Sequence, residues 1–441
     1  MSDSSFGKRV WTVLKISFPA AMYNLLGMVQ SMVDMLFVGR ISSVSVAAVG
    51  VSMQYVGMLY AFMSLFYVGT NALVSRFFGA KDPEKAGLVS YNMFVLALAF
   101  SVPLFVVGFY KSHVLFNILG MSGEIEEIGS VYMKIYCFSI PVLFAQGVLY
   151  SSLNAYGKTK IPFYIGIFGN IVNFLLDYAL IFGAWGFPAL GVAGVAYATV
   201  IARLLEFFIY AYLCFIRKEI DFVMRFSGDL LRRALKVGFP TWMERMMTFP
   251  TYIVLSALVA RYGTEALAGY QIGLRIEGIA FMPGVGFIVA TMALTGRHLG
   301  AGNPEEAEKD AMAATVAACA FMGTVGLLMF LFPAPLARMF TTDAATVASA
   351  AEYLRIMGLS QIPLGIFFVM SGALRGAGDT RTTFIVNTAC IWLLRVLPAA
   401  VMVWAGIALF WVYLVAALES AVRAGLLVRV FIRGRWKSIA V

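Results

Sequence analysis

The sequence predicts an all-helical integral membrane protein in which twelve transmembrane helices form two six-helix halves. Three observations predict it: an apolar composition, a series of span-length apolar runs and an internal repeat. Apolar residues make up 61% of the 441 residues and charged residues 13%, whereas soluble domains carry about 25% charged residues. A water-soluble core does not need this much apolar surface, but a membrane protein does.

Each predicted span is an apolar run of about the 20 residues that a helix needs to cross roughly 30 Å of hydrocarbon. The alternation of apolar and polar residues that is typical of a membrane β-barrel is missing from the sequence. The runs lie near residues 13–37, 46–75, 88–110, 131–155, 162–184, 189–216, 237–261, 267–296, 310–332, 350–374, 382–404 and 406–430.

The chain contains an internal repeat. Residues 14–86 align without a gap on residues 235–307, at an offset of 221, with 21 identities in 73 positions. The best-matched segments are LKISFP against LKVGFP and RFFGAKDPEKA against RHLGAGNPEEA. Six helices per half is an even number, so both halves enter the membrane from the same side, as in parallel-repeat transporters. We therefore predict an N-lobe at 1–221 and a C-lobe at 222–441, with a substrate path between them.

The net charge of +10 would suit a nucleic-acid partner, but its distribution indicates membrane topology instead. Loops after even-numbered helices, among which we place Arg375, and the two termini carry 22 Lys and Arg residues, against six on the opposite face. This bias predicts a protein of the cell (inner) membrane with both termini in the cytoplasm and no nucleic-acid partner. The four cysteines lack metal-ligand spacing, so we expect neither zinc nor disulfides.

Charged residues inside the predicted spans need partners, because each costs about 2.5–3.5 kcal/mol on insertion scales. Glu419 and Arg423 are four residues apart on one helix face, which predicts an ion pair. Arg275 and Glu277 are two apart and cannot face each other, so we predict Arg395 as the partner of Glu277. The same one-helix pairing is predicted for Arg203 and Glu206, which are three apart.

Asp34 and Asp177 have no cation three or four residues away on their own helices. Asn170, Asn173 and Asp177 are spaced i, i+3, i+7 and form one polar stripe. Buried carboxylate and amide oxygens suit a proton or Na⁺, with a hydrogen-bonded helix–helix contact as the alternative. Pro19 lies on the same predicted helix as Asp34 and permits either a switching or a static kink.

The acidic residues break the symmetry of the repeat. Asp34 corresponds to Leu255 at the offset of 221, and Glu244 corresponds to Tyr23. Glu244, beside Arg245, is either a second coupling or substrate carboxylate or one member of a charge pair.

The doubled loop motifs, RIEGIAFMPGVGF (275–287) and ALRGAGDTRT (373–382), together with the twelve helices, resemble the multidrug and toxic compound extrusion (MATE) family. The resemblance covers essentially the whole chain. It implies an efflux antiporter with a V-shaped pair of lobes, which exchanges small-molecule organic cations for Na⁺ or H⁺. It implies a transporter and not an enzyme, with no cofactor beyond the coupling ion, and we expect a monomer in the lipid bilayer.

The resemblance also implies roles for individual residues. One branch of the family uses an aspartate on helix 1 with an asparagine and an aspartate four apart on helix 5, a pattern that Asp34, Asn173 and Asp177 match, so that Na⁺ could bind there. Pro19 matches a bending proline, and Glu244 resembles an acid that another branch uses on helix 7. The candidate coupling residues are Asp34, Asn173, Asp177, Asn170, Thr199 and, on helix 4, either Gln146 or Asn154; the C-lobe candidates for coupling or substrate are Glu244, Glu277, Arg275 and Arg395.

Three alternatives compete with an efflux antiporter: a flippase, a transporter of another superfamily and a membrane enzyme. A lipid-linked oligosaccharide flippase of the same wider superfamily would need a cationic inner cavity, for which Arg245, Arg275 and Arg395 are available. The major facilitator superfamily also has two six-helix halves, but its charged loop motif after helix 2 is missing. A membrane enzyme lacks support, because His113 and His298 lie near loops and no nucleophile–base or metal spacing occurs.

Overall fold

The structure is a computed structural model that describes residues 5–118 and 120–439, and over these residues it is helical without strands. Nine of the described helices are long and apolar enough to cross a membrane, and a pair bent by 49° at a short break adds a tenth. Two further helices, α9 and α16, bring the long helical segments of the described chain to twelve. The predicted all-helical membrane fold is confirmed.

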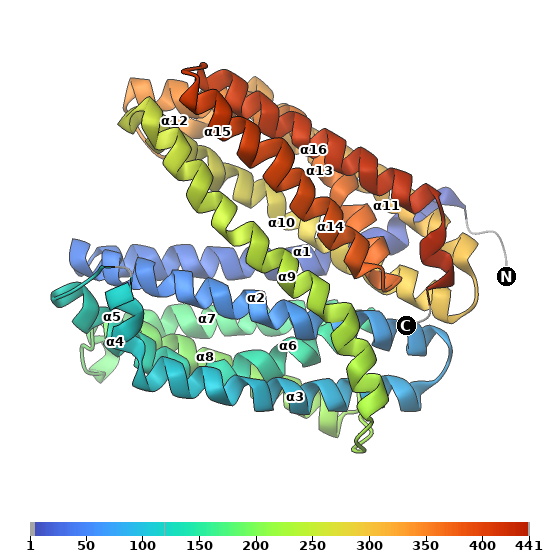
Figure 1. Ribbon diagram of the computed structural model, residues 1–441. Helices are drawn as coiled ribbons and strands as arrows, with labels where there is room; N and C mark the ends of the chain where they lie inside the picture. The colour runs from blue at the N-terminus through green and yellow to red at the C-terminus, as the bar shows by residue number, and fades with distance from the viewer. Residues whose placement is uncertain (1–4, 119, 440–441) are drawn as a thin grey trace. The chain divides into compact units, whose positions relative to one another are not determined.

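The helices of the first half follow the predicted spans (Figure 1). They are α1 (Phe6–Gly39), α2 (Ser43–Gly79), α3 (Pro83–Tyr110), the short α4 (Ser112–Ile118), α5 (Glu124–Cys137), α6 (Ile140–Ala155), α7 (Lys160–Phe182) and α8 (Val192–Ala211), which continues as a π-helical turn at Tyr212–Ile216.

The helices of the second half follow in the same order. They are α9 (Gly228–Val259), α10 (Thr264–Gly300), α11 (Pro304–Leu331), the short α12 (Pro333–Arg338), α13 (Ala344–Gly376), α14 (Thr380–Ala389), a π-helical segment at Cys390–Val396, α15 (Leu397–Trp404) and α16 (Leu409–Ile432).

The bounds of the helices repeat at the offset found in the sequence. Adding 221 to the bounds of α2 and α3 gives the bounds of α10 and α11, residue for residue. The repeated loop motif explains this register, because it ends one helix and begins the next. Asp82 caps α3 by accepting from the backbone N–H of Lys85 at 3.0 Å, and Pro83 fits the first helical turn, where no N–H is needed.

The one expected span that the structure breaks is 131–155, which forms the bent pair α5 and α6. The break falls at Phe138 and Ser139, and α6 then begins at Ile140 with Pro141 in its first turn. Proline cannot donate a backbone hydrogen bond to the preceding turn, so the helix ends there and a new one begins.

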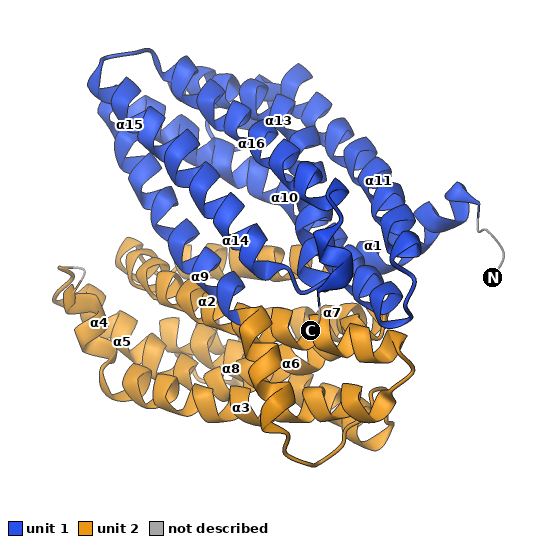
Figure 2. Ribbon diagram, turned by 45° about the vertical axis from the view of Figure 1, so that its right-hand side comes forward, with its two compact units in different colours: residues 1–21, 239–441 blue, residues 22–238 orange. Residues whose placement is uncertain are grey.

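The chain forms two compact units (Figure 2). One comprises residues 22–238, and the other comprises the residues up to Ala21 together with those from Phe239. Both boundaries fall inside a long helix, one two residues after Pro19 and the other two residues before Pro240. The first parts of α1 and α9 thus each pack with the helices of the other half, and the predicted domains 1–221 and 222–441 stay a prediction.

Glycine permits these two helix crossings. At Gly286 on α10, an added Cβ would overlap the carbonyl oxygen of Ser17 on α1. At Gly238 on α9, an added Cβ would overlap the carbonyl oxygen of Leu65 on α2. The two crossings are equivalent in the repeat, since adding 221 to 17 and 65 gives 238 and 286. In one crossing the glycine lies on α10, and in the other it lies on α9, which is the repeat equivalent of α1.

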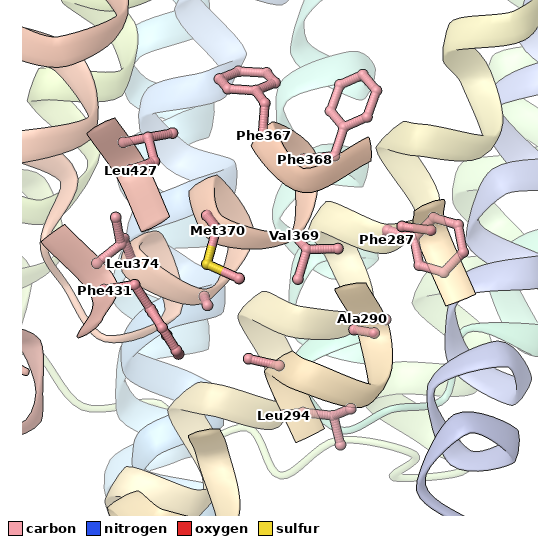
Figure 3. Close-up of a cluster of buried hydrophobic side chains, with 14 of the residues drawn as sticks. Phe287, Ala290, Leu294, Phe367, Phe368, Val369, Met370, Leu374, Leu427 and Phe431 are labelled. Carbon is pink, nitrogen blue, oxygen red and sulfur yellow. The ribbon is translucent and has the colours of Figure 1, made fainter. Parts of the chain in front are cut away.

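The unit that contains α10, α13 and α16 has an apolar core between these helices (Figure 3). Phe287 of α10, Phe368 of α13 and Leu427 of α16 are buried in it, and Val13 of α1 belongs to the same cluster. Burial of each large apolar side chain stabilises such a core by about 1.5–3 kcal/mol relative to exposure to water. The core fixes the helices that carry the charged cavity described below.

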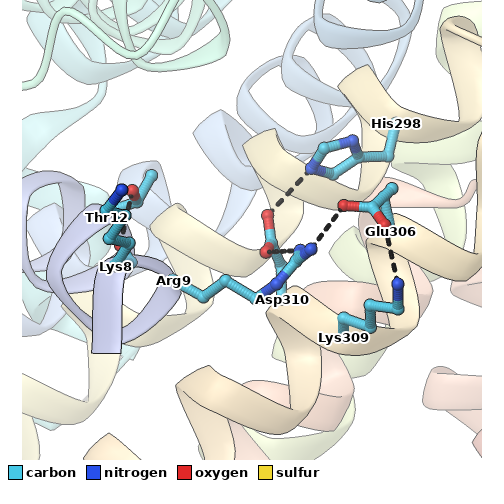
Figure 4. Close-up of polar contacts among 7 residues, drawn as sticks. All are labelled: Lys8, Arg9, Thr12, His298, Glu306, Lys309 and Asp310. Carbon is cyan, nitrogen blue, oxygen red and sulfur yellow. Dashed lines mark hydrogen bonds and ion pairs between the residues drawn. The ribbon is translucent and has the colours of Figure 1, made fainter. Parts of the chain in front are cut away.

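Ion pairs hold the start of α1 on α10 and α11 (Figure 4). The Arg9 guanidinium donates to Glu306 at 2.7 Å and to Asp310 at 2.9 Å. His298 of α10 lies 2.8 Å from the second oxygen of Asp310. The N-terminal turns of α1 are thus tied to the second half by charge as well as by apolar packing.

Candidate functional site

Three residues predicted from the sequence meet inside the unit formed by residues 22–238. With the Asn173 amide assigned so that its nitrogen faces the carboxylates, that nitrogen lies 3.1 Å from Asp34 Oδ1 and 3.2 Å from Asp177 Oδ2. Asp34 comes from α1, and the other two come from one face of α7. Asp34 is 4% exposed, Asn173 1% and Asp177 0%. The structure therefore brings together two buried carboxylates that share one amide.

This cluster has room for one more bonding partner. Asp177 Oδ1 is buried and has no hydrogen-bond partner among the described residues. Two ionised carboxylates held this closely repel each other in a low-dielectric environment, so a proton or a cation between them is favoured. The two carboxylates provide oxygen ligands that suit a hard cation such as Na⁺. Groups of three or more His, Cys, Asp or Glu residues that could hold a metal do not occur in the described chain.

Two neighbours of the cluster were missed by sequence reasoning. The side-chain amide of Gln30 lies 3.1 Å from the Asn173 nitrogen, and its spacing of four residues from Asp34 on α1 was an available signal. Tyr132 is fully buried and its hydroxyl has no hydrogen-bond partner in the described structure. Tyr132 is one of two tyrosines on α5, a helix that also carries three glutamates in its first turn, so the sequence gives no comparable signal for it.

The other predicted members of the site make different contacts. Asn170 donates to the carbonyl of Gly166 at 2.8 Å, one turn back on α7, and Thr199 donates to the carbonyl of Val195 at 2.9 Å on α8. Asn154 is fully buried near the end of α6.

Gln146 belongs to a second polar cluster in the same unit. Its amide nitrogen donates to Glu206 at 2.7 Å. Arg203 lies 3.8 Å from the same carboxylate and donates to the hydroxyl of Tyr60 at 2.9 Å, which confirms the predicted pair on α8. The Glu206 side chain lies directly against Gly169 of α7, where any Cβ would overlap it.

The unit made of the residues up to Ala21 and those from Phe239 has a cavity of about 460 Å³. It lies among α9, α10, α13, the π-helical segment after α14, and α16. Aromatic side chains make up much of its wall, including Tyr252, Tyr270, Phe281, Phe367 and Tyr413. The charged residues that line it are Glu244, Arg245, Glu277, Arg375, Arg395 and Arg423.

Glu244 is held by two residues that the sequence did not assign to the site. Its Oε1 accepts from Arg375 at 2.8 Å and from Asn387 at 2.7 Å. The placement of Arg375 in a loop is wrong: it is 5% exposed and lies within α13. The buried ion pair with Glu244 compensates the cost of placing the guanidinium there.

The contacts of the remaining charged residues contradict one predicted ion pair and confirm another. Arg395 pairs with Glu419 at 2.6 Å, and not with Glu277 as predicted. Glu277 accepts instead from the hydroxyl of Tyr353 at 2.5 Å. Arg423 lies 3.2 Å from Glu419, four residues earlier on α16, as predicted. Arg275 is exposed on α10 and is not among the residues that line the cavity.

Comparison with known proteins identifies the family. The model of the MatE family matches residues 19–179 and 240–401, once in each repeat. The chain is 31% identical over 436 residues to a probable multidrug resistance protein NorM of Thermotoga maritima, covering 97% of this chain and 93% of that one. It is 27% identical to the multidrug resistance protein NorM of Burkholderia vietnamiensis, covering 88% and 86%.

Solved structures share the fold. The bent form of the MATE transporter VcmN of Vibrio cholerae matches with a TM-score of 0.91 at 20% identity over 98% of both chains. A MOP superfamily transporter of Pyrococcus furiosus, described as having a binding pocket of reverse polarity, matches with a TM-score of 0.90 at 22% identity over 98% of this chain and 96% of that one. The family model, the Thermotoga relative and the twelve-helix repeat together show that this chain belongs to the MATE family of membrane transporters.

Proposed function

We propose that this protein is a secondary active antiporter of the cell membrane that exports lipophilic organic cations in exchange for H⁺ or Na⁺. It is a multidrug efflux transporter of the MATE family, as its relatives are named. The observation that carries the coupling proposal is the pair of buried carboxylates, Asp34 and Asp177, on one amide nitrogen. Neither carboxylate has a basic partner on its own helix, so an ion supplied from solution would complete the site.

The position of Asp34 links ion binding to a conformational change. Asp34 and Pro19 lie on α1, and the boundary between the two compact units falls after Ala21 on the same helix. A proline in a membrane helix removes one backbone hydrogen bond and lowers the resistance to bending. An ion that binds Asp34 in one conformation more tightly than in another shifts the population by that difference in affinity.

Other parts of the proposal come from the sequence and the family. The coupling ion is the only bound ion required, with no cofactor. The transporter acts as a monomer, and both termini lie in the cytoplasm, as the distribution of Lys and Arg indicates.

A lipid-linked oligosaccharide flippase remains the second candidate. The observation in its favour is the cavity among α9, α10, α13 and α16, which is lined by four arginines and two glutamates. A flippase would transport a lipid-linked sugar without a gradient-driven efflux of cations.

The experiment is reconstitution of the purified full-length protein in liposomes loaded with ethidium. We expect efflux of ethidium when an inward gradient of H⁺ or Na⁺ is imposed, one ion at a time, and not without a gradient. The absence of gradient-driven efflux with either ion, together with transfer of a fluorescent lipid-linked sugar between leaflets, would replace the proposal by the flippase.

A further inference from the structure

The cavity in the second-half unit has an unequal charge balance. Its wall contains four arginines and two glutamates. Glu419, which is 1% exposed, lies behind the wall and pairs with both Arg395 and Arg423. Even with all three acids ionised, the four arginines leave an excess of one positive charge.

Each acidic group around the cavity is already bonded to a neighbour. Glu244 is bonded to Arg375 and Asn387. Glu277 accepts from Tyr353, and Glu419 is shared by its two arginines. Each of these carboxylates therefore already has a partner, and Glu244 Oε2 is the lining carboxylate oxygen that is buried without a hydrogen bond among the described residues.

Arg245 is the cation that remains without an acidic partner. It lines the cavity and is exposed, and among the described residues no carboxylate lies within 4.0 Å of its guanidinium. Glu244 is adjacent in sequence, but successive residues on a helix point in different directions. An arginine within a membrane helix is costly unless it meets an anion or water, and a negatively charged group of a ligand in the cavity would be such a partner.

We infer that this cavity binds amphipathic organic acids, with the carboxylate of the ligand paired to Arg245 and its apolar part against the aromatic wall. The planar guanidinium matches a carboxylate with two parallel hydrogen bonds. The volume of about 460 Å³ lies within the range of about 300–1,000 Å³ for sites of drug-sized ligands. The inference rests on the proposed efflux function and adds amphipathic organic acids to the lipophilic cations proposed as its substrates.

Arg245 is the one arginine of the cavity wall without an acidic partner among the described residues, so the ligand is expected to carry one negative charge. A pyrophosphate group carries at least two negative charges and would need at least two unpaired cations in a low-dielectric cavity. Arg375, Arg395 and Arg423 are engaged with Glu244 and Glu419, which leaves one. The cavity therefore suits a monovalent acid better than a lipid-linked pyrophosphate.

The test compares two fluorescent ligands that differ only in charge, dansyl-phenylalanine and dansyl-phenylalaninamide. Binding to the purified full-length protein is followed by the emission of the dansyl group. We expect the acid to bind at least tenfold more tightly than the amide, as charge-assisted hydrogen bonds require. Equal affinity, or tighter binding of the amide or of the cation dansylcadaverine, would overturn the inference, and this comparison needs no variant.

Variants then assign the preference to one residue. Arg245→Gln is expected to remove the preference for the acid while it leaves the affinity for the amide unchanged, and Arg245→Lys to retain part of it. The matched control is Arg355→Gln, which changes an exposed arginine on α13 outside the cavity wall and should preserve the preference. A preference that survives Arg245→Gln would contradict the assignment.

The outcomes for the two proposals are independent. Ethidium efflux driven by an ion gradient can fail while the acid preference holds, and the preference can fail while efflux persists. Displacement of bound dansyl-phenylalanine by farnesyl pyrophosphate at a lower concentration than by N-acetylphenylalanine would contradict the assignment of a single charge.

Discussion

At the scale of single residues, the repeat carries different chemistry in its two copies. In the second half, Arg375 and Asn387 both donate to Glu244. The residues 221 positions earlier are Tyr23, Asn154 and Gly166, and Tyr23 stacks on Tyr150 at a ring distance of 4.7 Å. An ion pair in one copy is thus replaced by aromatic packing in the other.

The two polar sites differ in how far the sequence could predict them. Asn173 and Asp177 are one helical turn apart, so spacing alone placed them together. Asp34 was predicted because it too lacks a cation three or four residues away on its own helix, and the family pattern supports its place beside them. Glu244 and Arg375 are 131 residues apart, and helical periodicity says nothing about contacts between helices so distant in the chain. For the same reason, Glu419 was not foreseen as the partner of Arg395.

The contact between Gly169 and Glu206 predicts a destabilising substitution. In Gly169→Ala, the new methyl group would overlap the Glu206 side chain and displace it from Gln146. Overpacking of this kind costs about 1–3 kcal/mol, so we expect a lower midpoint of thermal unfolding in detergent. Gly50→Ala is the control, because nothing lies within 4 Å of a Cβ added there; an unchanged midpoint for Gly169→Ala would contradict the packing described.

The pair between Lys158 and Glu219 predicts a dependence of stability on pH. The hydrogen bond from Lys158, at 2.7 Å, lowers the pKa of Glu219 below its ordinary value. A carboxyl whose pKa is lower in the folded state stabilises it above the unfolded pKa, and this contribution is lost as pH falls through the folded pKa. Glu219→Gln should therefore lower the unfolding temperature at neutral pH and reduce its decline in acid. A decline identical to that of the wild-type protein would exclude the linkage.

At the scale of helices, the register of the repeat was predictable and the detail of the crossings was not. The ungapped alignment predicted α2 and α10, and α3 and α11, because capping residues recur with the repeat. The exchange of the first parts of α1 and α9 depends on contacts between distant helices. In the sequence, this exchange is visible only as a glycine on one of the two helices at each crossing.

These crossings predict that Gly238 and Gly286 tolerate no side chain. In Gly286→Ala the new Cβ would overlap backbone of α1, and in Gly238→Ala it would overlap backbone of α2. Backbone cannot move aside as a flexible side chain can, so each substitution should cost about 1–3 kcal/mol in unfolding measurements. Gly425→Ala on α16 meets nothing within 4 Å and should be neutral or slightly stabilising. Stability equal to that of the wild-type protein in both Gly238→Ala and Gly286→Ala would show that the crossings are looser than described.

At the scale of the whole molecule, the charge distribution predicts the orientation in the membrane. The 22 basic residues predicted on one face include both terminal segments. Green fluorescent protein fused after Val441 should therefore fluoresce, and alkaline phosphatase fused there should be inactive, because each reporter functions on one side only. The reverse pattern would invert the proposed topology.

The central claim is a division of roles: ion coupling in the unit of residues 22–238 and acid binding in the unit that contains α10 and α13. The most direct measurement is gradient-driven ethidium efflux by Asp34→Asn, compared with Asp82→Asn, which changes an acid at a helix cap where asparagine also caps well. We predict that Asp34→Asn lowers the efflux at least tenfold, while its affinity for dansyl-phenylalanine stays unchanged, and that Asp82→Asn alters neither. Full gradient-driven efflux in Asp34→Asn would contradict the account.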